Sequence, residues 1–419
     1  MSQVHIIGAG LAGLSAAVRL AAAGRKVSLW EAGPQAGGRC RSYFDEALGC
    51  RIDNGNHLLL SGNVAALDYL RLIGSADTLV GPAQPLFPFM DLATGERWTI
   101  ALDRGRLPFW LFDPARRVPG TRPFDYLGAL RLAVAGPEAT VDRVLGGAAV
   151  LYRRFWQPLA VSVLNTEAEA GAAALLWPVL RQTFGRGGAF CLPLVARDGL
   201  SESWVDPALD FLAARGGSMR TGMRGRRLGY TDGRVSELEI GGTTLPVAAD
   251  DTVILAVPPT VAADLVPGLV APTEFRPIVN AHFRLRDADS YDAGAVRIIG
   301  LVGGTAEWVF HRGPLASVTI SAANTLVDLD AEAIAARLWP EVATALGLVP
   351  QAMPAYRIVK EKRATFAQTP AQIRRRPPVR TAWRNLYLAG DWTNTGLPAT
   401  IEGTIRSGAS AASCVLENP

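Results

Sequence analysis

The sequence is poor in the residues that build metal sites and disulfide frameworks. Its 419 residues include only four cysteines and four histidines, and no two cysteines form a C-x-x-C pair. This scarcity argues against a zinc site and against a disulfide-stapled fold, so no metal is expected. A cytoplasmic chain with reduced thiols is the default interpretation.

Long apolar runs and a strong net charge are also missing. The uncharged stretch 170–180 is too short to cross a bilayer, since a spanning helix needs about 20 residues. The first apolar run begins at Val4 and leads directly into glycines, which is typical of a first strand rather than a signal peptide. The net charge of +4 argues neither for nor against nucleic-acid binding, and we expect no such partner. Any membrane contact is expected to be peripheral.

Two groups of arginines stand out against this mild charge. They are Arg374-Arg375-Arg376 and the group of Arg224, Arg226 and Arg227. We interpret each group as a solvated turn or strand end, because arginines mostly stand at the surface. Attraction to anionic lipid headgroups is the alternative.

What is present is an apolar fraction of 49%, enough for a large core, in a chain long enough for two domains. Residues 4–31 read as strand, glycine turn, helix and strand. Proline and aromatic residues recur over the next long stretch, which we interpret as a separate region. The sequence therefore predicts an α/β fold with a Rossmann-type dinucleotide-binding domain and an interleaved, mixed α+β substrate domain. The first domain takes residues 1–74, 196–270 and 379–419, and the second takes residues 75–195 and 271–378.

Periodicity and turn residues predict the main elements of these domains. Two strand-like runs flank Asp232-Gly233, which predicts a hairpin, and Gly241-Gly242 predicts another turn. Strands are expected at 252–257 and 386–389. Helices are expected over residues 12–23, 64–73, 124–134, 141–156 and 331–346, and from about residue 401 onward.

A glycine motif follows the first strand, Gly8-Ala9-Gly10-Leu11-Ala12-Gly13. Gly8 permits a tight turn, Gly10 lets backbone approach a pyrophosphate, and Gly13 lets helix and strand pack closely. The helix N-terminus then offers unpaired N–H groups and a positive dipole to phosphates, with Leu11 and Ala12 in its first turn. The pattern alone is weak, but its strand–turn–helix context makes it specific.

Residues after the helix narrow the choice of ligand. Glu31, at the end of the second strand, is placed to accept bonds from adenosine ribose hydroxyls, which favours FAD or NAD over NADP. Gly37 and Gly38 permit a second backbone approach, and Arg39 can place a charge-assisted bond on the pyrophosphate. This run favours FAD, and it resembles the start of the flavin amine oxidase and carotenoid desaturase superfamily. No cysteine suggests covalent attachment, so FAD is expected to be dissociable.

The C-terminal segment resembles the second FAD motif of the same superfamily. A strand ends in Gly390-Asp391, where the resemblance implies that Asp391 bonds a ribityl hydroxyl. A helix start follows at Thr400, Ile401 and Glu402, whose backbone N–H groups would face the flavin N1–C2=O edge. A helix dipole there stabilises an anionic reduced flavin. The resemblance also implies that Met223 presents backbone atoms to the adenine, and that Asn56 lies among the cofactor-binding residues.

Three interpretations of the enzyme remain open, which are an amine oxidase, a polyene desaturase and a hydroxysqualene dehydroxylase. The sequence is most similar to the last family, the squalene-associated FAD-dependent desaturases of bacterial hopanoid synthesis. The similar segments are residues 53–63, 163–166 and 391–403. A flavin-bearing, lipid-binding scaffold without turnover is the non-enzymatic alternative. The aromatic-rich stretch 75–195 could line the long apolar tunnel that a C30 substrate needs.

The dehydroxylase resemblance implies a reaction and a set of partners. A hydroxylated squalene would lose its allylic hydroxyl with proton assistance, and reduced flavin N5 would deliver hydride to the cation. His57 is the candidate acid, with a structural histidine as the alternative. Asp53 could orient His57 or cap its loop, and Asn165 could lie in the substrate cavity or be structural. The implied partners are an apolar substrate, the inner membrane as a peripheral contact, and other enzymes of squalene synthesis.

Overall fold

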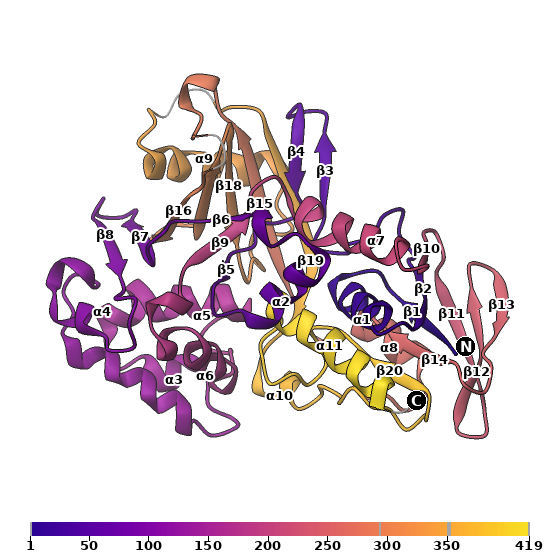
Figure 1. Ribbon diagram of the computed structural model, residues 1–419. Helices are drawn as coiled ribbons and strands as arrows, with labels where there is room; N and C mark the ends of the chain where they lie inside the picture. Colours follow the sequence, from indigo (N-terminus) through magenta and orange to yellow (C-terminus); the bar gives the residue numbers. More distant parts are fainter. Residues whose placement is uncertain (1, 293–294, 350–352, 418–419) are drawn as a thin grey trace.

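The computed structural model describes residues 2–292, 295–349 and 353–417 (Figure 1). Its first sheet is parallel throughout, with strand order β10-β2-β1-β14-β20. These strands come from four distant parts of the chain: β1 Gln3–Ile7, β2 Lys26–Trp30, β10 Ser218–Arg220, β14 Thr252–Leu255 and β20 Leu386–Leu388. This sheet is the predicted Rossmann-type core, and its order brings the N-terminal and C-terminal segments close together.

Both faces of this sheet are covered, which explains its nearly continuous apolar strands. Ile6 and Ile254 face a core formed with α1 (Leu11–Ala22), α2 (Val64–Ile73), α7 (Asp206–Ala213) and α11 (Ile401–Glu417). Ile7 and Leu255 face the opposite core. That core includes α8 (Pro259–Leu265) and the antiparallel sheet of β11 (Gly225–Thr231), β12 (Arg234–Ile240) and β13 (Thr243–Pro246).

The second large sheet has seven strands in the order β19-β15-β18-β17-β16-β7-β8. One face packs against α9 (Ala331–Leu346) in an apolar core, and the opposite face carries Asn280, Ser317 and Thr319. The strands are β7 Leu86–Asp91, β8 Arg97–Ala101, β15 Phe275–Arg284, β16 Arg297–Val302, β17 Trp308–Arg312, β18 Leu315–Ile320 and β19 Tyr356–Phe366. Small pairings add β3 Ser42–Asp45 with β4 Cys50–Asp53, and β9 Pro193–Ala196 with β5 Leu59–Leu60 and β6 Leu79–Val80.

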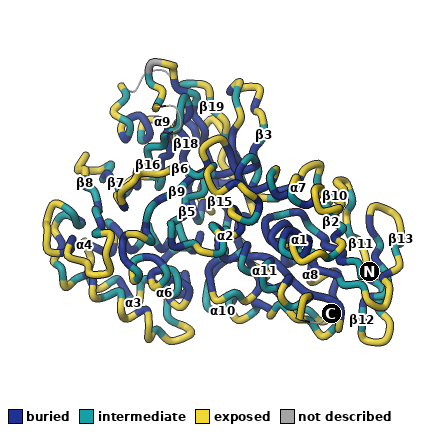
Figure 2. The backbone as a smooth tube through the Cα atoms, viewed as in Figure 1, coloured by how far each residue is buried: buried dark blue, intermediate teal, exposed yellow. Residues whose placement is uncertain are grey.

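A helical region separates β8 from β9 and packs around its own aromatic core (Figures 1 and 2). The helix predicted over 124–134 is a 3₁₀ helix, η4 (Pro123–Val134), rather than an α-helix. The helix predicted over 141–156 is interrupted at Gly146-Gly147 and continues as a π-helical turn, Tyr152–Trp156. The α-helices of this helical region are α3 Val141–Leu145, α4 Ala149–Leu151, α5 Gln157–Leu164 and α6 Ala173–Gln182.

Several local predictions are confirmed. The helices over 64–73 and 331–346 have the predicted bounds, and α1 and α11 begin within one residue of their predicted starts. Asp232 and Gly233 have φ of 50° and 73°, so both adopt the left-handed conformation that the hairpin between β11 and β12 requires. Among the described residues, no helix is both long enough and apolar enough to span a bilayer.

Candidate functional site

The turn between β1 and α1 leaves the N-terminus of α1 open. Gly8 has φ of 105°, and a Cβ there would lie 2.3 Å from the carbonyl oxygen of Ala256. A Cβ on Gly13 would lie 1.9 Å from the carbonyl oxygen of Gly8, whereas a Cβ on Gly10 would meet nothing within 4 Å. Among the described residues, nothing accepts a hydrogen bond from the backbone N–H groups of Leu11 and Ala12. The turn therefore fits a pyrophosphate, as the motif predicts.

Glu31 closes the other side of this turn. Its carboxylate accepts hydrogen bonds from the N–H groups of Ala9 (2.8 Å) and Gly33 (2.7 Å). The backbone N–H of Met223 donates to the carbonyl of Glu31 at 2.8 Å, so the two predicted adenosine contacts are neighbours. Gly37 donates to the carbonyl of Ala9 at 2.8 Å and has φ of 98°, which brings the Gly37-Gly38 turn beside the first glycine turn.

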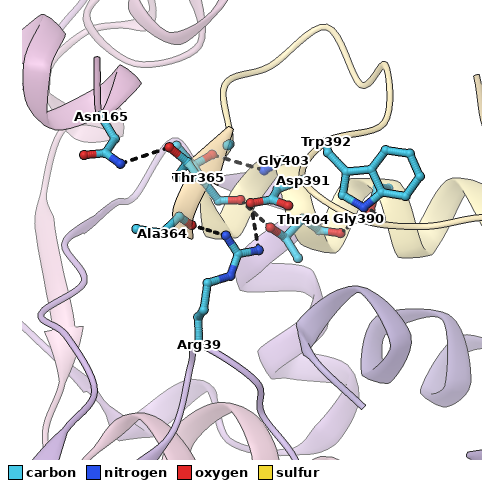
Figure 3. A network of polar contacts seen from close by, with 12 residues as sticks. Arg39, Asn165, Ala364, Thr365, Gly390, Asp391, Trp392, Gly403 and Thr404 are labelled. Atoms are coloured by element: carbon cyan, nitrogen blue, oxygen red, sulfur yellow. Dashed lines mark hydrogen bonds and ion pairs between the residues drawn. The ribbon is translucent and has the colours of Figure 1, made fainter. Parts of the chain in front are cut away.

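Arg39 joins the front of the chain to its back (Figure 3). Its guanidinium forms an ion pair with Asp391 at 2.8 Å and donates to the carbonyl of Ala364. Asp391 follows Gly390 at the end of β20, and its carboxylate is buried. The structure thus brings together the two side chains that the sequence assigned to the pyrophosphate and the ribityl chain.

The start of α11 presents free N–H groups at the same edge. The Thr400 hydroxyl accepts a hydrogen bond from the N–H of Gly403 at 3.2 Å and so caps the helix. The N–H groups of Ile401 and Glu402 donate to no other described residue. The Glu402 side chain points elsewhere, since its carboxylate accepts from the N–H groups of Ala65 (3.2 Å) and Ala66 (2.9 Å) and caps α2.

Arg376 is a site residue that the sequence analysis placed wrongly. Both interpretations of the 374–376 cluster put it in solvent or at lipid, but Arg376 is buried. Its guanidinium donates to the carbonyls of Leu397 (2.8 Å) and Asp391 (3.2 Å) and to the Thr395 hydroxyl (3.1 Å). Burial lowers its pKa to about 10, against a raising effect of Asp391. Arg376 therefore fixes the loop between β20 and α11 from inside.

The loop after β4 lies on the polar face of the seven-stranded sheet. The Asn56 amide donates to the Thr319 hydroxyl at 3.0 Å, and Thr319 donates to the Asn280 amide oxygen at 2.7 Å. Asn280 in turn donates to the carbonyl of Asn54 at 3.2 Å. A Cβ at Gly55 would lie 2.9 Å from the Asn280 side-chain nitrogen, so a larger residue would have to displace this amide. This row of polar side chains holds the loop after β4 against the seven-stranded sheet.

A small cavity, partly open to solvent, lies between this loop and the sheet. Burial lowers the pKa of His57 to about 4; Asp53 raises this pKa, and Arg39 lowers it further. The imidazole is therefore neutral near pH 7. The polar lining is Asp53, Asn56, His57, Arg312 and Ser317, and the apolar lining is Val195, Ala196, Leu200, Val296, Phe310 and Leu315.

Asp53 and Asn165 are each held by several hydrogen bonds. Asp53 accepts from the Ser42 hydroxyl (2.7 Å) and the Leu200 N–H (2.9 Å), and it pairs with Arg312 at 3.3 Å. Asp53 and His57 line the same cavity, but no hydrogen bond joins them among the described contacts. Asn165 is not part of that lining. Its amide nitrogen donates to the Thr365 hydroxyl at 3.0 Å (Figure 3) and to the Arg276 carbonyl at 3.1 Å. Its amide oxygen accepts from the Ala322 N–H at 2.7 Å.

Two ionisable groups at the seven-stranded sheet were missed by the sequence analysis, the half-buried Glu307 and the buried His282. Burial raises the pKa of Glu307 to about 7, against hydrogen bonds from Ser321 that lower it. Its carboxylate accepts from the Ser321 N–H at 2.8 Å. His282 lies 2.8 Å from the Ser317 hydroxyl, and burial lowers its pKa to about 4. No motif marks either residue, because burial on a sheet face comes from the tertiary fold.

The likeness to known proteins extends over the whole chain. The family model described as flavin containing amine oxidoreductase matches residues 11–416. Hydroxysqualene dehydroxylases of Rhodopseudomonas palustris and Sinorhizobium fredii are 49% and 48% identical over 414 residues, covering 99% of this chain and 98% of each relative. Among solved structures, an oxidoreductase from Methanosarcina mazei aligns with a TM-score of 0.71 at 15% identity, over 98% of this chain and 100% of the other. The predicted superfamily and α/β fold are confirmed, and the chain belongs to the flavin-containing amine oxidoreductase family, with FAD as its cofactor.

Proposed function

We propose that the protein catalyses the FAD-dependent reductive dehydroxylation of hydroxysqualene to squalene in hopanoid synthesis. The observation that carries this proposal is the whole-chain likeness to two proteins named hydroxysqualene dehydroxylase. The likeness is not confined to the dinucleotide-binding segments. It includes the sheet and the helical region that would receive the substrate, and these are the parts that set specificity.

The flavin site supplies the binding part of this function. We assign the pyrophosphate to the open N-terminus of α1 and to Arg39, and the adenosine to Glu31 and the backbone of Met223. Asp391 would accept a ribityl hydroxyl, and the free N–H groups of Ile401 and Glu402 would face the flavin edge. When bound and reduced, FAD supplies the hydride that replaces the lost hydroxyl.

The departing hydroxyl must take up a proton to leave as water, and the allylic carbon then accepts the hydride, so that charge and electrons balance. We assign the proton to His57, which lines the cavity beside the flavin-side loop. Asp53 lines the same cavity. Because it bonds Ser42, Leu200 and Arg312, we assign it a structural role in fixing the loop. Its negative charge also raises the pKa of His57, which favours the protonated imidazole.

The apolar lining supports the same chemistry. Six of the eleven residues that line the cavity are aliphatic or aromatic, and such side chains would keep water away from an allylic cation. Asn165 is assigned a positioning role, because its amide ties the end of α5 to β19 rather than facing the cavity. A peripheral location at the inner membrane and association with other enzymes of squalene synthesis complete the proposal.

An anaerobic experiment tests the reaction. Bound flavin is reduced photochemically, hydroxysqualene is added in detergent, and flavin absorbance is followed together with mass spectrometry of a hexane extract. Reoxidation with formation of squalene is the expected result. Reoxidation only by oxygen, with peroxide formed from an amine, would show an amine oxidase. Dehydrogenation of a polyene by oxidised flavin would show a desaturase, and no turnover would leave a flavin-bearing scaffold.

A further inference from the structure

The helical region exposes an unusual number of large apolar side chains. Of the fifteen large apolar side chains that are exposed among the described residues, seven lie within residues 107–134. A soluble surface normally scatters such residues singly, so a cluster needs an occupant. The seven are Leu107, Phe109, Phe112, Phe124, Leu127, Leu130 and Val134, which together we call the apolar patch.

The 3₁₀ geometry of η4 explains how the patch forms. Side chains three residues apart align in a 3₁₀ helix. Phe124, Leu127 and Leu130 therefore form one outward stripe, and all three are exposed. Tyr126 and Leu132, which share the next stripe, are buried in the aromatic core. The helix is thus apolar on two stripes, although only one of them has a partner inside the protein.

The remaining patch residues flank the same core. Trp110, between Phe109 and Phe112, packs edge-on against Tyr126 with ring centroids 5.4 Å apart. This contact packs η2 (Phe109–Phe112) against η4 through their buried aromatic side chains. The exposed apolar side chains of both segments face solvent. Figure 1 shows this part of the chain at the edge of the molecule, beside α3 and away from the β11–β13 sheet.

The charge around the patch matches an anionic surface. Residues 103–134 contain six arginines and three aspartates, a net charge of +3. The aspartates have internal partners: Asp103 bonds Trp110 and Arg116, while Asp113 and Asp125 cap 3₁₀ helices. Arg106, Arg122 and Arg131 are exposed, and their side chains have no partner among the described residues. Clusters of apolar side chains with free arginines are the signature of binding in a membrane interface.

We propose that the apolar patch docks the protein on a bilayer that contains anionic lipids, with Arg106, Arg122 and Arg131 at the headgroups. The inference rests on the proposed function and deepens it, because that function includes a peripheral membrane location and a C30 alcohol substrate that resides in lipid. The arginine groups at 224–227 and 374–376 do not make this contact. Neither group has an apolar surround like the patch, because none of the exposed large apolar side chains among the described residues lies within it or beside it in the sequence. In the second group, Arg376 is also buried and Arg374 pairs with Glu138.

Vesicle co-sedimentation of the FAD-loaded protein tests the proposal. We expect binding to vesicles of phosphatidylcholine with phosphatidylglycerol and weaker binding to phosphatidylcholine alone. The double variant Phe124→Ser/Leu127→Ser should lose at least about tenfold in partitioning. The matched control Phe44→Ser/Val270→Ser, which alters two apolar side chains 58% and 57% exposed elsewhere, should bind like the parent. Arg106→Gln/Arg131→Gln should lose about fivefold per arginine, on anionic vesicles only.

Four results would overturn the proposal. In the first, the parent protein stays in solution with both kinds of vesicle. In the second, the patch and control variants lose vesicle binding equally. In the third, the patch variant binds vesicles as well as the parent does. The fourth is a dimer, seen by light scattering, that the patch variant dissociates while vesicles bind neither protein. Melting temperature and flavin absorbance exclude misfolding of the variants. Vesicle binding without turnover of detergent-solubilised hydroxysqualene would refute the proposed function and leave the docking surface standing.

Discussion

Replacing Glu307 by glutamine should make the protein more stable at pH 8 but not at pH 4.5. Burial raises the pKa of this carboxyl from 4.5 to about 7. An unfolded chain releases the Glu307 proton near pH 4.5, whereas the folded chain holds it until about pH 7. Folding therefore loses stability as pH rises from 4.5 to 7, and the full loss remains above pH 7.

The size of this loss follows from the two pKa values. A difference between 4.5 and about 7 corresponds to roughly 3 kcal/mol in the free energy of unfolding. Glutamine cannot ionise, and its side-chain oxygen can still accept the hydrogen bond from Ser321. A domain of about 200 residues shifts its melting temperature by about 2–4 °C per kcal/mol, and this longer chain by about half as much. We therefore expect E307Q to melt roughly 3–6 °C above the parent at pH 8.

Thermal unfolding of the FAD-loaded proteins, followed by tryptophan fluorescence from pH 4.5 to 8, measures this difference. Other titrating groups are common to both proteins and cancel in the comparison. Glu332→Gln, at an exposed position of α9, is the matched control and should give a difference independent of pH. If the difference in melting temperature between E307Q and the parent does not change with pH, the assignment of a raised pKa to Glu307 is refuted.

Three further predictions concern the site. Gly13→Ala should abolish flavin binding, seen as loss of flavin absorbance in the purified protein, whereas Gly147→Ala, where a Cβ has open space, should retain it. Glu402→Ala should destabilise the protein by about 1 kcal/mol or more, measured by denaturant unfolding, because two N–H groups of α2 lose their cap. If His57 is the acid, the rate of dehydroxylation should rise about tenfold per pH unit as pH falls from 7 toward its pKa of about 4. His57→Ala should remove this dependence, and full activity in that variant would exclude His57 as the acid.

The dinucleotide end of the site was predictable because each role there depends on local backbone. A tight turn, a close approach and an open helix start all require particular residues at fixed spacing, and Gly8, Gly10 and Gly13 lie where the motif requires them. Asp391 and Thr400 were instead assigned by resemblance to the second FAD motif of the superfamily. The rest of the site depends on contacts between residues far apart in sequence, for which no spacing rule exists.

Arg376, Asn165 and η4 show three forms of that limit. Arg376 looks like one member of a basic run, and only the folded loop shows that its partners are backbone oxygens. Asn165 has φ of 45°, so it ends α5 in a left-handed conformation, and its amide then reaches β15 and β19. The apolar pattern of 124–134 indicated a helix but not its 3₁₀ form, because exposed apolar residues blur the period on which the distinction rests.

The contacts between the two ends of the chain couple the assigned flavin site to the folding of the chain. Arg39 pairs with Asp391, Glu402 caps α2, and the Ser15 hydroxyl donates to the carbonyl of Ile405 at 2.8 Å. Each contact joins the first 70 residues to the last 30, and each lies beside a group assigned to FAD. A ligand that binds only when both ends are docked stabilises the folded state in proportion to the logarithm of its concentration. Removal of α11 would therefore abolish the assigned flavin contacts and also remove part of the helical cover on one face of the five-stranded sheet.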